Sequence, residues 1–468
     1  MMTRQTKHNV FFIIIGIVAI LAMRYFCPFA EEITRESRTY IGCFAFLLIC
    51  LLSKALTDWA AILLTMFFLV AFKVADIPTV TSQFSGSTLW LCIGVFIMSI
   101  GINNCGIMKR FALWALTKFS GTYKSQVVGM LIAGLITTPF IPSSYAKTSV
   151  MAPLIGEVCV ALGVKPNSKA ARGLWFANFM GTYVLGMAFL SGSAFVAVMI
   201  GFMNGLKFTW IDWLRCTAVW YIITIILTFI YSAFICKPDQ DLTGDVSFIK
   251  EKRKALGKLN LKEKQGILIL LFAIVLWLTE PLHKINAAMV CLCVDAVFAM
   301  CGLINTNELG TKGMWNTIIF LGGMLSIADL MKSTGTDRWI ASLLSPVLSP
   351  ILVNPYIFVS VLCIIVFAFR YVIASQMCML TIIYAIFAPL LSSYGYSVFV
   401  LIFVTWVCGT NWQTSYGNPA VFGFVKLTGK SCIDFSDAQK TSYAYMIITT
   451  IAMTISVPVW QSLNLIII

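Results

Sequence analysis

A lysine lies within a long apolar stretch of the chain, close to two adjacent serines. Lys147 follows Ser143 and Ser144 by about one helical turn. A charged side chain inside the hydrocarbon region costs about 2.5–3.5 kcal/mol on insertion scales, so this lysine needs a partner or a role. The two serines stand where a helix would begin, and free backbone amides and the helix dipole attract negative charge there. These residue types predict a binding site for an anion such as a carboxylate.

Two structural alternatives for Lys147 remain open. Its ammonium group would extend to the membrane surface along its flexible stem. Alternatively, it would pair with Glu157 in an ion pair that serves only stability.

A similar set of polar residues interrupts an apolar stretch in the second half of the chain. Arg370, Ser375 and Gln376 supply a cation, a hydroxyl and an amide. Arg370 also has a structural alternative, since one or two turns below a hairpin tip it would only stabilise the hairpin. Two facing tips of this kind suit a substrate with two carboxylates. Further donors and acceptors, or helix caps, are Ser191 and Ser193 in the first half and Thr414, Ser415 and Asn418 in the second.

The composition shows what must position these residues. Of the 468 residues, 59% are hydrophobic and only 11% are charged, which is typical of a polytopic membrane protein. A helical span needs about 20 apolar residues, so the apolar segments account for about ten or eleven crossings. The fifteen cysteines form no CxxC pair, and most lie within apolar runs, where thiols act as small hydrophobic groups.

The net charge of +14 is concentrated in a few loops. In a soluble protein such a charge would suggest nucleic acid, but in a membrane protein the positive-inside rule reads clustered lysines and arginines as topology. Basic loops at residues 109–124, 165–172 and 250–264 are therefore expected in the cytoplasm. The N-terminus is expected inside, with residues 9–27 as an uncleaved anchor, and the C-terminus outside.

The two halves of the chain repeat on either side of the hydrophilic residues 237–265. In the first half an apolar run from residue 126 breaks at residues 142–144 and resumes to residue 162, with basic loops at both ends. In the second half a run from residue 355 breaks at residues 370–376. Each run is too short for two crossings and predicts a re-entrant hairpin. Five crossings per half would insert the second copy upside down, which is the inverted-repeat design of secondary transporters.

Each predicted hairpin is followed by a second interrupted helix. The breaks are at residues 191–193 and within residues 408–422. Non-helical backbone at membrane depth is tolerated only where it faces protein or a water-filled cavity. Four such breaks predict one shared site near the middle of the bilayer.

The order of these motifs along almost the whole chain resembles the divalent anion/sodium symporter (DASS) family, in particular its branch of citrate/succinate antiporters and 2-oxoglutarate/malate translocators. That branch has a pattern close to P-S-N-T-A-R-T followed by apolar residues and proline, matched here by PSSYAKT at residues 142–148 and by Pro153. The stretches LGVKPNSKAARG, FLSGSAF, WNTIIFLGGML, ASQMC and TSYGNPAVF follow in the family's order.

The resemblance implies a homodimer in a bacterial inner membrane, in which each protomer carries its substrate across as an elevator. Residues 1–122 and 266–340 would form the scaffold, residues 123–236 and 341–468 the mobile transport domain, and residues 237–265 a cytoplasmic linker. Family members bind substrate through Ser-Asn-Thr signatures at the two tips, and sodium sites, where present, would lie near Ser143 and Ser375. The substrate-binding candidates are then Ser143, Ser144, Tyr145, Lys147, Thr148, Ser191, Ser193, Ser375, Gln376, Thr414, Ser415 and Asn418.

The signatures are incomplete in this chain, which bears on the coupling ion. Ser144 and Tyr145 replace the first asparagine and threonine, and Gln376 and Met377 follow Ser375 in the second signature. Exchange of anions and sodium-coupled symport of a dicarboxylate therefore both remain open. A membrane-embedded enzyme is disfavoured, because the chain has two histidines and neither an HExxH nor a GxSxG motif. Apart from sodium, no cofactor is expected.

Overall fold

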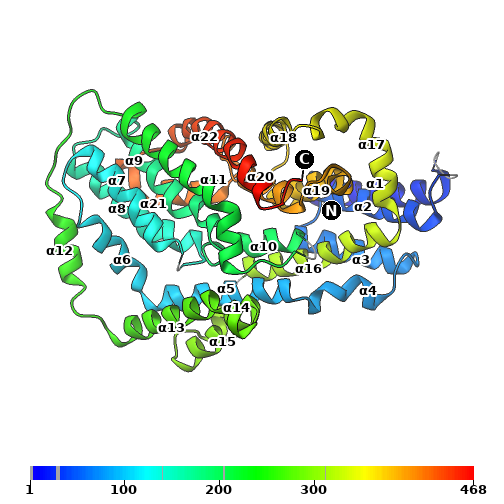
Figure 1. The fold of residues 1–468 in the computed structure, drawn as a ribbon, viewed down its shortest axis with the longest axis horizontal. Coiled ribbons are helices and arrows are strands. Elements are labelled where there is room, and N and C mark those ends of the chain that lie inside the picture. Colours follow the sequence, from blue (N-terminus) through cyan, green and yellow to red (C-terminus); the bar gives the residue numbers. More distant parts are fainter. Residues whose placement is uncertain (1–3, 28–31, 140, 204–205, 311, 468) are drawn as a thin grey trace.

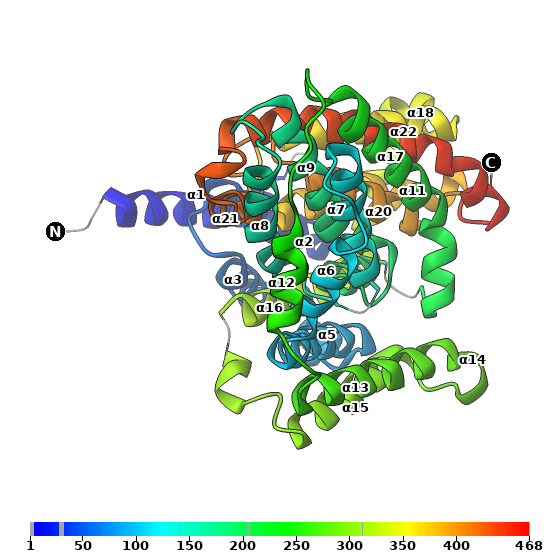
Figure 2. The same ribbon diagram turned by 90° about the vertical axis from the view of Figure 1, so that its left-hand side faces the viewer.

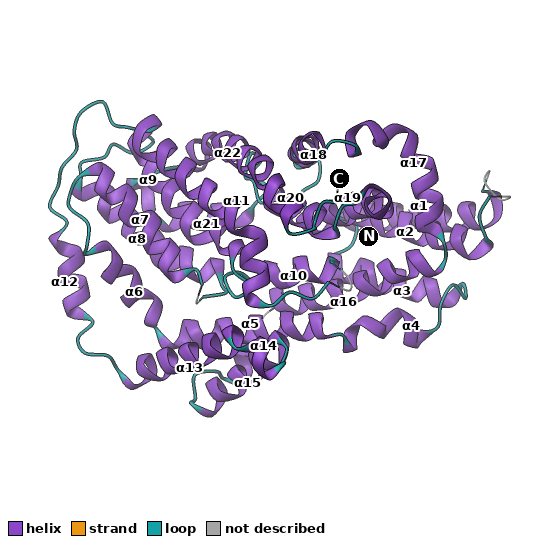
Figure 3. Cartoon of the chain, viewed as in Figure 1, coloured by secondary structure: helices purple, strands orange, loops and turns teal. Residues whose placement is uncertain are grey.

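The computed structural model describes residues 4–27, 32–139, 141–203, 206–310 and 312–467. Within these ranges every extended regular element is a helix, and β structure is restricted to two isolated bridges (Figure 3). The expectation of an all-helical, multi-pass membrane protein is confirmed.

The chain begins with a group of helices that precede the first hairpin. The first helix exposes large apolar side chains such as Phe11 and Val18, as a lipid-facing helix does. The second is capped by Thr34, whose hydroxyl accepts a hydrogen bond from the amide of Ser37. The group consists of α1 (Arg4–Phe26), α2 (Arg35–Ser53), α3 (Asp58–Ala71), α4 (Ile77–Thr81), η1 (Ser82–Ser85), α5 (Ser87–Cys105) and α6 (Ile107–Leu116).

The first predicted hairpin is formed by two helices on either side of the polar break. They are α7 (Tyr123–Thr137) and α8 (Ser144–Ala161), so the break lies where the proline and serines predict it. The hairpin packs against the helix that follows it at a close glycine contact. A Cβ atom added to Gly134 would lie 2.5 Å from the carbonyl carbon of Gly181, so a larger residue would force the two segments apart.

The helix after the first hairpin is interrupted, as the sequence predicts. It starts as α9 (Lys169–Phe179), continues through a π-helical turn, η2 (Met180–Val184), and a 3-10 turn, η3 (Leu185–Ala188), and resumes as α10 (Ala194–Phe202). Single π turns within helices are frequent at functional sites.

A linker and a separate layer of helices follow. The first half ends with α11 (Trp210–Ile230) and η4 (Tyr231–Ile235), and the linker then contains a short helix, α12 (Ser247–Ala255). Helix α12 lies across one end of the molecule, as Figures 1 and 2 show together. The layer beside α5 is made of α13 (Leu261–Leu278), α14 (Glu280–His283) and α15 (Ala287–Met300).

The second half repeats the order of the first. After η5 (Thr306–Gly310) come α16 (Lys312–Ser333) and α17 (Thr336–Leu352), then the hairpin α18 (Pro355–Phe369) and α19 (Gln376–Leu391), and a short turn η6 (Ser392–Tyr394). The second interrupted helix is α20 (Val398–Gly409) and α21 (Pro419–Leu427), followed by η7 (Gly429–Ser431) and α22 (Phe435–Ser462). Hairpin α7–α8 lies on the left in Figure 1, and hairpin α18–α19 lies to the right of it.

Seven of the described helices are long and apolar enough to cross a membrane alone, or eight if the pair α17–α18, bent by 112°, counts as one span. The sequence predicts about eleven crossings. The difference lies in helices that are short or broken, because α3, α15 and α20 are apolar but have only 14, 14 and 12 residues.

Candidate functional site

The tip of the first hairpin packs against the first interrupted helix. The hydroxyl of Ser144, at the start of α8, lies 3.4 Å from the carbonyl oxygen of Tyr183 and 3.5 Å from Oγ of Ser193. The backbone amide of Ala194 donates to the carbonyl of Pro142 over 2.9 Å. These contacts hold the beginning of α8 beside the beginning of α10, so two helix N-termini lie together.

Lys147 points into this contact and is completely buried. Its ammonium group donates a hydrogen bond to the carbonyl oxygen of Gly192 over 2.8 Å. Gly192 must be a glycine, because a Cβ atom there would lie 2.4 Å from the carbonyl oxygen of Gly186. Within the described ranges, no carboxylate forms an ion pair with Lys147.

Both structural alternatives for Lys147 are therefore wrong. The lysine does not reach the surface, since none of its side chain is exposed. It does not pair with Glu157 either, because that carboxylate forms a salt bridge of 2.5 Å with Lys252 of α12. Among the described residues, the buried ammonium is balanced by the dipole of one backbone carbonyl.

Arg370 ends α18 and is also completely buried. Its guanidinium donates to the carbonyl oxygens of Ile373 over 3.0 Å and Ala374 over 2.7 Å, and it contacts the carbonyl of Gly417 closely. These bonds tie the tip of the second hairpin to the second interrupted helix. The interpretation that Arg370 stabilises the hairpin is supported.

The two tip residues of the second hairpin are both engaged. Ser375 caps α19 by accepting from the amide of Cys378, and its hydroxyl donates to Oδ2 of Asp58 over 3.2 Å. The amide of Gln376 donates to the carbonyl of Trp406 over 2.9 Å and to Oγ1 of Thr410 over 3.2 Å.

Several other candidates serve as caps or local braces. Ser193 caps α10 and Asn418 caps α21. Ser191 donates to the carbonyl of Pro139 over 2.6 Å and accepts from the indole of Trp210. The remaining candidates are Thr148, which donates to the carbonyl of Ser144; Ser143, whose carbonyl accepts from the amide of Lys147; Ser415, which is exposed; and Tyr145, whose side chain lies outside the described residues.

Thr414 differs from these candidates. Its hydroxyl is buried and, within the described part of the chain, has no hydrogen-bond partner. A Cβ atom added to Gly417 would lie 2.9 Å from this hydroxyl, so only a glycine leaves room beside it.

An aromatic row connects the two tips. The ring centroids of Tyr183 and Phe195 are 6.3 Å apart, and those of Phe195 and Trp406 are 5.5 Å apart. The tips contact the backbone of two of these residues, since Ser144 lies near the carbonyl oxygen of Tyr183 and Gln376 donates to the carbonyl oxygen of Trp406. The aromatic row thus joins the segments that the two tips contact.

The contact between Asp58 and Ser375 was not foreseen from the sequence. Asp58 lies in the first turn of α3, where an acidic residue is common because it complements the helix dipole. The preceding loop approaches the same region, since Nζ of Lys54 lies 5.9 Å from the ring centroid of Tyr416. No local pattern signals either contact, because the partners are hundreds of residues apart.

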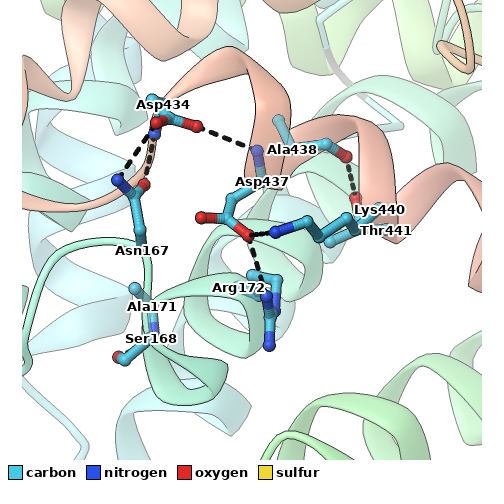
Figure 4. A network of polar contacts seen from close by, with 9 residues as sticks. All are labelled: Asn167, Ser168, Ala171, Arg172, Asp434, Asp437, Ala438, Lys440 and Thr441. Atoms are coloured by element: carbon cyan, nitrogen blue, oxygen red, sulfur yellow. Dashed lines mark hydrogen bonds and ion pairs between the residues drawn. The ribbon is translucent and has the colours of Figure 1, made fainter.

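A polar network joins the first interrupted helix to the second half (Figure 4). Arg172 of α9 and Lys440 of α22 both contact Oδ1 of Asp437, over 2.8 and 2.6 Å. Asn167 exchanges two hydrogen bonds with Asp434, at the start of α22. The network holds α9 and α22 together at one end.

No metal centre of the usual kind is found in the described ranges, where no three His, Cys, Asp or Glu side chains gather. The tips offer hydroxyl and carbonyl oxygens instead, which are ligands that hard cations prefer.

A family model described as the sodium:sulfate symporter transmembrane region matches residues 7–466. An uncharacterized transporter of Haemophilus influenzae is 24% identical over 284 residues, 59% of this chain and 59% of that protein. The inner membrane protein YbhI of Escherichia coli is 24% identical over 279 residues, 58% of each chain. The L-tartrate/succinate antiporter of Escherichia coli K12 is 24% identical over 321 residues, 65% of this chain and 64% of that protein. The alignments thus span about three fifths of these relatives.

Two solved structures have a similar fold. The YdaH transporter of Alcanivorax borkumensis superposes with a TM-score of 0.55 and 14% identity, over 82% of this chain and 88% of that chain. The antimetabolite efflux pump MtrF of Neisseria gonorrhoeae superposes with a TM-score of 0.53 and 14% identity, over 97% of this chain and 95% of that chain.

Proposed function

Because the chain belongs to the sodium:sulfate symporter family, whose members are membrane transporters rather than enzymes, we propose that it carries small di- or tricarboxylate anions across the membrane by exchange. The observation that carries this proposal is Lys147, a buried ammonium that, in the described part of the chain, forms no ion pair with a carboxylate and donates to the carbonyl of Gly192. A substrate carboxylate at the start of α8 would complete the charge balance. The L-tartrate/succinate antiporter among the relatives supports this class of substrate, and we place the chain in the citrate/succinate antiporter and 2-oxoglutarate/malate translocator branch.

Anion exchange is the expected mode of transport because the charge of Lys147 stays on the carrier throughout the cycle. A carrier that moves a desolvated, incompletely balanced ammonium through the membrane pays a large electrostatic cost. A bound anion lowers that cost, so the loaded carrier crosses more readily than the empty one. Return without a counter-substrate is then slow, which is the behaviour of an obligate exchanger.

Sodium-coupled symport is the second candidate. The family description names sodium, and the tips carry oxygen ligands near Ser143 and Ser375. In this alternative a bound cation, renewed in each cycle, would supply the positive charge.

We propose an elevator mechanism in a homodimer, with residues 123–236 and 341–468 as the moving part. Two hairpins and two interrupted helices converge there, and the network around Asp437 joins elements of both segments. Residues 1–122 and 266–340 would form the fixed scaffold, with residues 237–265 as the linker between the halves.

The test is transport by the purified protein in proteoliposomes. Vesicles loaded with unlabelled succinate, tartrate, citrate or sulfate are diluted into labelled succinate, with and without a sodium gradient. We expect uptake that requires an internal carboxylate and is indifferent to sodium. Concentrative uptake into vesicles that contain no anion, driven by a sodium gradient, would instead establish symport.

A further inference from the structure

A groove of about 540 Å³ lies between the end of α6 and the linker helix α12. Its volume is within the range of about 300–1,000 Å³ that is usual for small-molecule sites. The groove differs from the hairpin tips in its chemistry, because its side chains are almost all cationic. They are Arg110, Thr117, Lys118, Lys250, Arg253 and Lys254.

One of these cations is already neutralised. Arg110 forms two hydrogen bonds with the carboxylate of Glu263, over 3.0 and 2.9 Å. It also donates to the carbonyl of Gly257 over 2.8 Å, which fixes the loop after α12. Arg110 therefore stabilises one side of the groove.

None of the other cations forms a salt bridge within the described part of the chain, although Lys250 interacts with the nearby charge of Asp245. Arg253 donates to the hydroxyl of Thr117 over 3.2 Å, a neutral group. Within the described part of the chain, Lys118, Lys250 and Lys254 form no salt bridge, and no acidic residue lines the groove. Hydrogen bonds from Ser247 and, to a smaller extent, the charge of Lys250 hold the pKa of Asp245 below its usual value. This carboxylate is not among the residues that line the groove.

The helix ends beside the groove do not account for so much positive charge. Helices α6 and α12 end at Leu116 and Ala255. Each C-terminus carries about half a negative charge, so the two together offset about one of the four remaining cations. Topology alone requires basic residues in this loop, but not their gathering around one concave site.

We propose that this groove binds a phosphate-bearing anion. A phosphate monoester or diphosphate carries about two negative charges at neutral pH and several strong acceptor oxygens, which match several lysines and an arginine. The phosphate belongs either to a soluble molecule or to the headgroup of an anionic lipid, since both occur at this face of a membrane. This site is independent of the anion that the protein transports.

Helix α12 connects the groove to the first hairpin. On another side of the same helix, Lys252 forms the salt bridge with Glu157 of α8, in the first hairpin. An anion between α6 and α12 therefore holds a helix that also contacts the hairpin. Occupation of the groove would stabilise α12 and, through it, the cytoplasmic end of the hairpin.

The test is binding of inorganic pyrophosphate to the full-length protein, by titration calorimetry, in nanodiscs of phosphatidylcholine with and without phosphatidylglycerol. The double variant Lys250→Gln/Lys254→Gln removes two charges and leaves Arg110 and Arg253 in place. We expect it to weaken pyrophosphate binding by about tenfold or more, since two charge-assisted contacts are lost. Lys262→Gln, at an exposed lysine in the first turn of α13 and outside the groove, should bind as the wild type does.

The lipid arm separates the two sources of phosphate. If lipid headgroups occupy the groove, phosphatidylglycerol weakens pyrophosphate binding to the wild type. Hydrogen exchange in α12 then slows in the phosphatidylglycerol nanodiscs for the wild type and Lys262→Gln, which keep Lys250 and Lys254, but not for the double variant. If the ligand is soluble, pyrophosphate slows this exchange in both membranes. The proposal is overturned if neither ligand protects α12, or if the double variant and Lys262→Gln give the same binding and exchange.

Discussion

At the scale of single residues, the two buried cations differ in how many of their donors are used. The guanidinium of Arg370 is engaged by three backbone carbonyls, so it fixes the second tip in place. The ammonium of Lys147 has three donors, of which one bonds to Gly192. Lys147 therefore keeps donors that a substrate carboxylate could use, and within the described residues Nε of Arg370 and the hydroxyl of Thr414 are also buried donors without a partner.

We predict that Lys147→Met separates binding from stability. Methionine has a similar length and removes a buried charge, so thermal stability should stay the same or rise. Binding of succinate should weaken about tenfold or more, because a charge-assisted contact is lost. Both quantities are measured by thermal unfolding with increasing succinate. Lys332→Met, at an exposed lysine of α16, is the control for charge loss. If the two variants bound succinate with equal affinity, Lys147 would not be part of the binding site.

At the scale of elements, local patterns predict the interruptions well and the contacts across them poorly. Proline and serine mark the start of α8 at Ser144, and the polar run before Gln376 marks the start of α19, because helix ends depend on neighbouring residues. The partner of Glu157 depends on where α12 packs, and α12 itself lies in a segment that was expected only to link the halves. The contact between Asp58 and Ser375 spans 317 residues and has no local signal.

The contact between Asp58 and Ser375 makes it possible to test whether the second hairpin moves relative to α3. Asp58 belongs to the proposed scaffold and Ser375 to the proposed transport domain. A cysteine pair at these positions should form a cross-link in the conformation described here and abolish exchange until it is reduced. A pair at Asn167 and Asp434, both within the proposed moving part and joined through short side chains, should cross-link and leave most exchange intact. Normal exchange by the protein linked between positions 58 and 375 would exclude an elevator movement between these elements.

At the scale of the whole molecule, the clustered basic loops and the repeated order of elements favour the topology expected from the sequence. The basic loops around α6, α9 and α12 lie toward the same end as the open end of hairpin α7–α8 (Figures 1 and 2), and hairpin α18–α19 lies to the right of that hairpin in Figure 1. Two halves with the same element order and opposite orientation place equivalent breaks next to each other from the two sides of the membrane.

The inverted topology predicts opposite accessibility for the two hairpin bases. Ser120, just before α7, and Ser393, just after α19, are both exposed. The described cysteines are buried except for Cys293 and Cys301, so replacing these two gives a background of low reactivity. In this background a membrane-impermeant maleimide should label Ser120→Cys only from the cytoplasmic side and Ser393→Cys only from the external side. Labelling of both positions from one side would mean that the two hairpins enter together, and the charge-balanced site between opposing tips would lose its structural basis.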